Sequence, residues 1–330
     1  MIIHHGGTAV AKGLYWSPMD GGRVDLQDRG ILPGEKTCSY LRMSPLVLLL
    51  IAHAVRKHNV PVVYNVIFKY EWTRILLFNL YALRIVKKII VNSPMIRGDL
   101  HRRTAGLRDR TETIPLGVNG AIYHPQRDGE ENILRKAHNT PANTKLVGMV
   151  ARYDRIKGHE TFLRAATRVC EVRQDVKFFI IGGSVLVNQI PGAGEYRGKI
   201  LNLRRELHLE NTVTFIDEHP DVPALMRSLD LLVCPSDSEG FGLVVLEALA
   251  SGVLVIASRF IGAVEYLDGE PGIFIAEPHS TESFVCVMLH VLEHLDHGNS
   301  RYTVSERLIR RFTWQTHASA CERVYEECSL

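Results

Sequence analysis

The chain has 330 residues, of which 46% are hydrophobic and 23% are charged. This length and apolar content favour two domains over one large core. Lys and Arg total 39 against 36 acidic residues, so the net charge of +3 is too balanced to indicate nucleic-acid binding. The six cysteines are scattered without a CxxC pair, which is typical of reduced thiols in a cytoplasmic protein.

The first half of the chain alternates between helix-like and strand-like apolar segments. The patterns predict a helix over 44–59, a strand over 60–68, a helix over 70–84, and strands over 89–91 and 111–119. The most apolar stretch, 45–55, is too short to span a bilayer. Polar residues and prolines between 123 and 143 indicate an interdomain linker.

The second half repeats short apolar strands, each followed by a turn or a helix. Strands are predicted over 145–153, 176–183, 211–217, 231–234, 253–258 and 272–277. Strands without polar alternation are typical of a parallel sheet that helices cover on both faces. The pattern therefore predicts an α/β fold.

The most informative stretch, 236–252, reads SDSEGFGLVVLEALASG and directly follows a predicted strand. Gly240 and Gly242 allow the backbone to approach a ligand closely. The first amides of the following helix, at Phe241, Gly242 and Leu243, favour a phosphate. Glu239 precedes the helix and Glu247 lies on it, near the same face. A phosphate between two hydroxyl-binding carboxylates describes a nucleotide-sugar site, and the alternative is an ordinary turn with a capping glutamate.

Two cations follow the strand predicted over 145–153. Arg152 lies just past its end, and Lys157 precedes Gly158 at the entry to a helix. Such a pair could clamp a diphosphate and neutralise the charge that grows on a departing nucleoside diphosphate. The alternative is two solvated charges on a loop.

The 236–252 string resembles the donor-site signature of the retaining glycosyltransferase family 4. Other segments that resemble this family are 114–125, 149–166, 251–267 and 312–327. The resemblance implies the α/β GT-B fold, with two Rossmann-like domains whose parallel sheets face a cleft. Residues 1–130 would form the acceptor-side domain, 131–310 the nucleotide-sugar domain, and 311–330 a helix that crosses back to the first domain.

The resemblance also implies a role for each candidate residue. Arg152 and Lys157 would hold the donor diphosphate, Glu239 the sugar hydroxyls, and Glu247 the ribose. The reaction would move a hexose-type sugar from a nucleoside-diphosphate sugar to a glycan, lipid or small-molecule acceptor. UDP is favoured over GDP as the nucleotide of the donor. It would need no metal and no cofactor. Backbone groups next to Asp217 and Glu218 would contact the nucleobase.

The first half departs from the family pattern in two ways. No strong strand-loop-helix unit frames Gly6-Gly7 or Gly21-Gly22, so we expect a shortened first domain. The chain has Ile67 where the family commonly carries a cleft histidine, so we expect weak transfer. Two alternatives stay open: another GT-B enzyme, such as an epimerase, and a non-catalytic nucleotide-sugar-binding protein.

Basic and apolar residues occur together over 69–88. They could form an amphipathic surface that touches an anionic membrane and a lipid-linked acceptor at its inner face. The alternative is a partly buried helix with a basic end.

Overall fold

The computed structural model describes residues 2–5, 62–66, 86–103, 105–182, 193–217, 219–267, 269–296 and 306–329. The chain divides into two compact units, one of Met1–Gly117 with Trp314–Leu330 and one of Val118–Thr313. The sequence predicted the first domain boundary at 130/131, whereas the structure divides into its two units at 117/118. The helices predicted over 44–59 and 70–84, the glycine pairs at 6–7 and 21–22, Ile67, and positions 69–85 of the basic segment lie outside the described residues.

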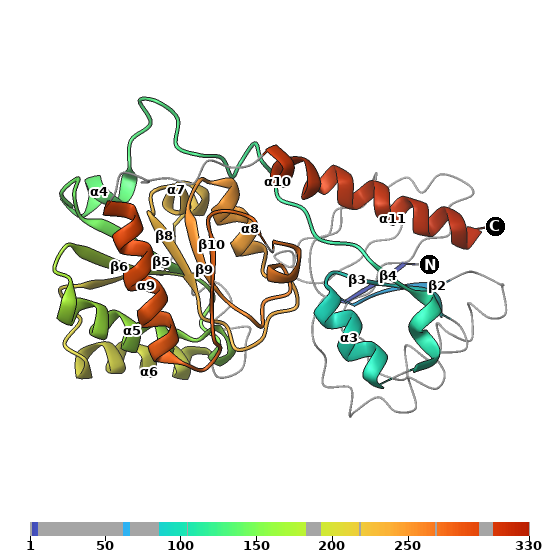
Figure 1. Cartoon of the computed structure of the whole chain (residues 1–330), viewed down its shortest axis with the longest axis horizontal. Coiled ribbons are helices and arrows are strands. Elements are labelled where there is room, and N and C mark those ends of the chain that lie inside the picture. The colour runs from blue at the N-terminus through green and yellow to red at the C-terminus, as the bar shows by residue number, and fades with distance from the viewer. Residues whose placement is uncertain are drawn as a thin grey trace. The chain divides into compact units, whose positions relative to one another are not determined.

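Unit 1 contains a four-stranded parallel sheet (Figure 1). Its strands, in spatial order, are β1 (Ile2–His5), β2 (Val62–Val66), β3 (Val86–Val91) and β4 (Thr111–Thr113). The helices α3 (Pro94–Arg103) and η2 (Ala105–Arg110) connect β3 to β4.

This sheet differs from the sequence prediction in three features. β3 begins at Val86, three residues before the start of the strand predicted over 89–91. β1 was missed, because its four residues, two of them histidines, have little strand character without their partner β2. The strand predicted over 111–119 ends at Thr113. Pro115 follows two residues later and has no N–H with which to continue the ladder.

The C-terminal helix α11 (Trp314–Ser329) packs on the unit 1 sheet. One buried cluster joins the strand residues Val63 and Ile90 to Cys321 and Val324 of the helix. Lys88 of β3 reinforces this contact through ion pairs with Glu112 (3.1 Å) and Glu327 (3.4 Å). A segment more than 200 positions distant in sequence therefore completes the core of unit 1.

Unit 2 contains a six-stranded parallel sheet with strand order β10-β9-β8-β5-β6-β7. Its strands are β5 (Lys145–Val150), β6 (Val176–Ile181), β7 (Val213–Ile216), β8 (Leu231–Cys234), β9 (Leu254–Ser258) and β10 (Ile273–Ala276). Each lies within the bounds predicted from the sequence. Every residue of β8 and β9 is buried, as expected for strands covered on both faces.

Two groups of helices cover this sheet (Figure 1). One group is α5 (His159–Val172), α6 (Ala193–Glu206) and α9 (Thr281–Asp296), and the other is α4 (Ile133–Ala137), α7 (Val222–Arg227) and α8 (Leu243–Ala250). The remaining short elements are η3 (Arg155–Lys157), η4 (Val264–Tyr266) and α10 (Glu306–Arg311). Within the described ranges, no helix has the length and apolarity that crossing a membrane requires.

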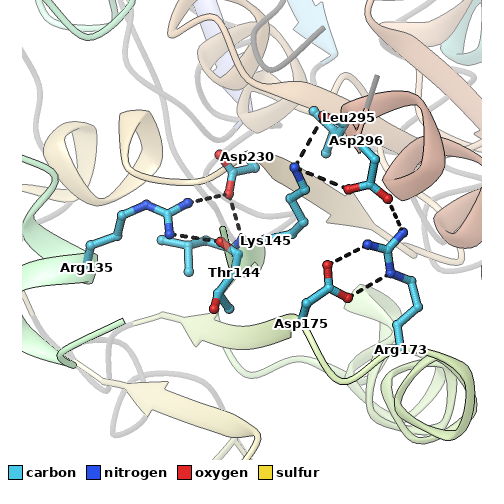
Figure 2. A network of polar contacts seen from close by, with 9 residues as sticks. Arg135, Thr144, Lys145, Arg173, Asp175, Asp230, Leu295 and Asp296 are labelled. Carbon is cyan, nitrogen blue, oxygen red and sulfur yellow. Dashed lines mark hydrogen bonds and ion pairs between the residues drawn. The ribbon is translucent and has the colours of Figure 1, made fainter. Parts of the chain in front are cut away.

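A polar network closes the amino edge of the unit 2 sheet (Figure 2). Arg135 of α4 pairs with Asp230, which precedes β8, at 3.0 Å. Arg173 pairs with Asp175 at 2.6 Å and with Asp296, at the end of α9, at 2.7 Å. These bonds tie helix ends to strand starts, and the loops that carry the predicted motifs lie at the opposite, carboxyl edge.

Candidate functional site

Two loops meet at the carboxyl edge of the unit 2 sheet. One follows β5 and contains η3 and Gly158, and the other follows β8 and leads into α8. The N–H of Asp237 donates to the carbonyl of Ile156 at 2.8 Å and joins the two loops. Gly158 has φ 77°, and a Cβ at this position would lie 2.2 Å from the carbonyl oxygen of Pro235. The close approach of the loops therefore requires glycine here.

Lys157 and Glu239 form an ion pair where these loops meet. Their Nζ and Oε1 atoms are 2.7 Å apart, and the side chains are only 13% and 17% exposed. The hydroxyl of Ser236 donates to the other carboxylate oxygen at 3.3 Å. The structure thus brings the predicted diphosphate cation into direct contact with the predicted sugar-binding carboxylate.

The backbone of the 239–241 turn is fixed by the loop that follows β9. The N–H of Glu239 donates to the carbonyl of Phe260 at 3.0 Å, and the N–H of Gly262 donates back to the carbonyl of Glu239 at 3.1 Å. The N–H of Ala263 donates to the carbonyl of Phe241 at 2.7 Å. The carboxylate of Glu239 therefore projects from a rigid turn.

Helix α8 begins directly after this turn, and its first amides are available to a ligand. Gly242 precedes the helix with φ 86°, and a Cβ there would lie 2.4 Å from Cγ2 of Ile261. Gly240 is buried in the turn. In the part of the chain that the structure describes, the N–H groups of Phe241, Gly242 and Leu243 donate to no protein acceptor. Unpaired donors at a helix start favour an anion.

Glu247 lies on α8 and is held in an apolar environment. Burial raises the pKa of its carboxyl to about 7, and a hydrogen bond with the hydroxyl of Tyr123 opposes this shift. Tyr123 had no predicted role. It belongs to the 114–125 segment that resembles the family, but no local pattern connects it to Glu247.

Arg152 lies at the start of the η3 loop and is 37% exposed. Its NH2 atom pairs with Asp154 Oδ2 at 2.8 Å. Its Nε atom is buried without a hydrogen-bond partner in the described part of the chain. Arg152 and Lys157 therefore share one loop but contact different carboxylates.

A second polar group supports the η3 loop from the side of β7. The hydroxyl of Tyr153 donates to Asp217 Oδ1 at 3.1 Å, and Nε of Arg197 donates to the same oxygen at 3.0 Å. The guanidinium of Arg197 holds the pKa of Asp217 below its usual range. The ring of Tyr153 stacks on that of His159 with centroids 5.2 Å apart. Asp217 thus fixes the loop, and Glu218 lies outside the described residues.

No group of three or more His, Cys, Asp or Glu side chains that could hold a metal ion occurs among the residues described. Positive groups at the carboxyl edge include Arg152, Lys157 and the start of α8. Together with the two carboxylates, they form a site suited to an anion that carries hydroxyl groups.

Sequence comparison identifies the relatives of the chain. The family described as Glycosyl transferases group 1 matches residues 130–301. The D-inositol 3-phosphate glycosyltransferase of Corynebacterium diphtheriae is 28% identical over 249 residues, 73% of this chain and 56% of that one. The enzyme of the same name from Saccharomonospora viridis is 24% identical over 73% of this chain and 55% of that one. The chain spans about half the length of these curated relatives.

Solved structures share the fold. Anabaena HepE in complex with UDP and glucose superposes with a TM-score of 0.71 at 22% identity, over 88% of this chain and 77% of that one. Sucrose-phosphate synthase from Thermosynechococcus elongatus gives a TM-score of 0.69 at 24% identity, over 86% and 71%. These likenesses confirm the predicted α/β GT-B fold. The family match covers more than half of the chain and includes Arg152, Lys157, Glu239 and Glu247, so the chain belongs to the family of Glycosyl transferases group 1.

Proposed function

We propose that this chain is a retaining glycosyltransferase. It moves a hexose-type sugar from a nucleoside-diphosphate sugar, UDP before GDP, to a glycan, lipid-linked or small-molecule acceptor on the cytoplasmic side of the membrane. The observation that carries this proposal is the Lys157–Glu239 pair beside the first turn of α8. The names of the relatives, which are glycosyltransferases, and the UDP in the HepE structure support it.

The diphosphate is bound by the positive groups of the carboxyl edge. Lys157, Arg152 and the free amides at 241–243 lie on the two loops that meet at this edge, and they would bind the phosphate oxygens. When the bond to the sugar breaks, negative charge grows on the departing diphosphate, and fixed positive groups stabilise it without reorganising. These groups supply the positive charge, so the proposal includes no metal and no cofactor.

The two carboxylates bind hydroxyl groups on either side of the diphosphate. Glu239 projects from its rigid turn toward Lys157 and accepts hydrogen bonds from the donor sugar. Glu247 lies further along α8 and accepts hydrogen bonds from the ribose. The chain needs no general base of its own if the leaving phosphate takes the proton of the acceptor, as the family resemblance implies.

The nucleotide site is tested by calorimetry with UDP and GDP on the full chain. Charge-assisted contacts contribute about 1.5–3 kcal/mol. We therefore expect Arg152→Ala and Lys157→Ala each to weaken binding about 10- to 100-fold. Arg155→Ala is the matched control, because Arg155 is an exposed cation on the same short helix. Wild-type affinity in both site variants would remove these residues from the proposed site.

Turnover is tested separately with UDP-hexoses and a panel of acceptors. NMR of the product should show the anomeric configuration of the donor. Tight donor binding without transfer to any acceptor would identify a binding protein instead. Conversion of the donor alone to another nucleotide sugar would identify an epimerase.

A further inference from the structure

A cavity of about 250 Å³ lies at the amino edge of the unit 2 sheet. The residues that line it lie in three segments: within 138–144 before β5, within 170–177 from the end of α5 to the start of β6, and at 211–212 before β7. These segments lead into strand starts, whereas the loops of the candidate donor site follow strand ends. The cavity is therefore separate from the donor site.

Two walls of this cavity are held in place by hydrogen bonds. Nη1 of Arg135 donates to the carbonyls of Pro141 at 2.7 Å and Thr144 at 2.8 Å, which fixes the loop before β5 (Figure 2). On the side of β7, the N–H of Phe178 donates to the carbonyl of Thr212 at 2.9 Å. The cavity is therefore formed without a ligand, so a ligand need not order these segments.

Lys177 brings an uncompensated positive charge to the cavity. It lies two residues before Phe179 on β6, so both side chains project from the same face of the sheet. The ring of Phe179 contacts the imidazole of His138, with centroids 5.4 Å apart. Burial and the charge of Lys177 lower the pKa of His138. Lys177 forms no ion pair in the described part of the chain, and none of the described lining residues is Asp or Glu.

Arg173 adds fixed hydrogen-bond donors just after α5. Its Nε and Nη2 atoms donate to the two oxygens of Asp175 at 2.9 and 2.6 Å, and Nη1 donates to Asp296 at 2.7 Å (Figure 2). A guanidinium has five N–H groups, so two remain. Lys145 also pairs with Asp296, at 3.4 Å. Two cations thus balance two carboxylates here, and the charge of Lys177 stays in excess.

We propose that this cavity is a second ligand site and binds a small sugar phosphate. Lys177 and the remaining N–H groups of Arg173 hold the phosphate through charge-assisted hydrogen bonds. The volume is below the range of about 300–1,000 Å³ that is typical of larger ligands, which limits the ligand to about one sugar unit. The side chains suited to its hydroxyl groups are amides and hydroxyls, on Asn139, Thr140, Gln174, Asn211 and Thr212.

The test is calorimetry of the full chain at pH 7 with mannose 6-phosphate, inorganic phosphate and mannose. Mannose 6-phosphate should bind more tightly than inorganic phosphate, and neutral mannose should not bind. Lys177→Gln should weaken mannose 6-phosphate binding about 10-fold, the lower end for a charge-assisted contact, because Lys177 is only half-buried. Lys136→Gln is the matched control and should leave this affinity unchanged, because Lys136 is 70% exposed and does not line the cavity.

NMR of the His138 imidazole shows where the probe binds, with its signals assigned from His138→Gln. A phosphate beside this ring favours the protonated form, so mannose 6-phosphate should raise the pKa of His138. The donor site is tested in parallel with UDP. Lys177→Gln should bind UDP like the wild type, and Lys157→Ala should bind mannose 6-phosphate like the wild type. Loss of the proposed nucleotide site would therefore leave this inference standing.

Three results would refute the amino-edge site: no binding of mannose 6-phosphate to the wild type, equal binding by Lys177→Gln, or an unchanged pKa of His138 on binding. Equal losses of UDP and mannose 6-phosphate affinity in Lys177→Gln would show a general structural defect and refute it too. Inorganic phosphate that binds as tightly as mannose 6-phosphate would refute a sugar phosphate as the ligand.

Discussion

Replacement of Gly158 by alanine should damage both the stability of unit 2 and its nucleotide site. Gly158 has φ 77°, in the left-handed region, where a side chain costs about 1–2 kcal/mol. The added Cβ would also lie 2.2 Å from the Pro235 carbonyl oxygen and 2.9 Å from its carbonyl carbon. These are backbone atoms and cannot rotate away, so the overlap adds about 1–3 kcal/mol, as overpacking typically does. We expect a total loss of about 2–5 kcal/mol.

Gly129→Ala separates the two contributions. Gly129 has nearly the same φ, 79°, but a Cβ there would meet no atom within 4 Å. It should cost only the backbone term of about 1–2 kcal/mol. In thermal unfolding, each kcal/mol lowers Tm by about 2–4 °C for a unit of this size. The difference between the two variants measures the contact between the loops.

The same pair of variants tests whether this contact supports the site. The overlap in Gly158→Ala is relieved by separating the two loops, which lengthens the Asp237–Ile156 hydrogen bond and the Lys157–Glu239 pair. UDP affinity should therefore fall in Gly158→Ala and persist in Gly129→Ala. Equal Tm losses in the two variants would refute the reasoning, as would unchanged UDP affinity in Gly158→Ala.

Two further predictions concern charges in unit 2. The Lys157–Glu239 pair is tested by urea unfolding of Lys157→Met, Glu239→Gln and the double variant. Because the pair is largely buried, we expect a coupling energy of about 0.5–3 kcal/mol between the two positions. Strictly additive losses in the free energy of unfolding would contradict this. Burial and Lys157 lower the pKa of His159 from 6.5 to about 4, so the folded state keeps it neutral while the unfolded state protonates it. As pH falls from 6.5 to 4, the free energy of unfolding should decrease by up to about 1.4 kcal/mol per pH unit from this residue, and His159→Gln should show a flatter slope. A slope equal to that of the wild type would contradict the assignment.

The elements of unit 2 were predictable because their signals are local. Its strands read as continuous apolar runs since helices cover both faces of the sheet, and each run ends where a turn residue follows. Gly242 was also predictable from a local signal, because its positive φ within the motif favours glycine. By contrast, β1 becomes a strand only through its pairing with β2, which no pattern within residues 2–5 records.

The contacts of the site were not predictable, because they join residues far apart in the sequence. Lys157 and Glu239 belong to two separate sequence motifs, and nothing in either motif indicates that their side chains form an ion pair. Tyr123 opposes the rise in the pKa of Glu247, and no local pattern in the sequence connects these two residues. Sequence patterns identified the types of groups present, whereas the pairing between them depends on how the loops pack.

The carboxylate of Glu239 has its protein partners in place before a ligand arrives, and this bears on how a donor would be held. It accepts hydrogen bonds from Lys157 and Ser236. An ammonium group has three N–H donors and a carboxylate has about four acceptor positions, so these bonds leave capacity for phosphate and hydroxyl groups. The Lys157–Glu239 pair is therefore no obstacle to a donor. In the proposed function, the pair would hold the cation and the carboxylate next to each other, and the ligand would extend the network without having to break it.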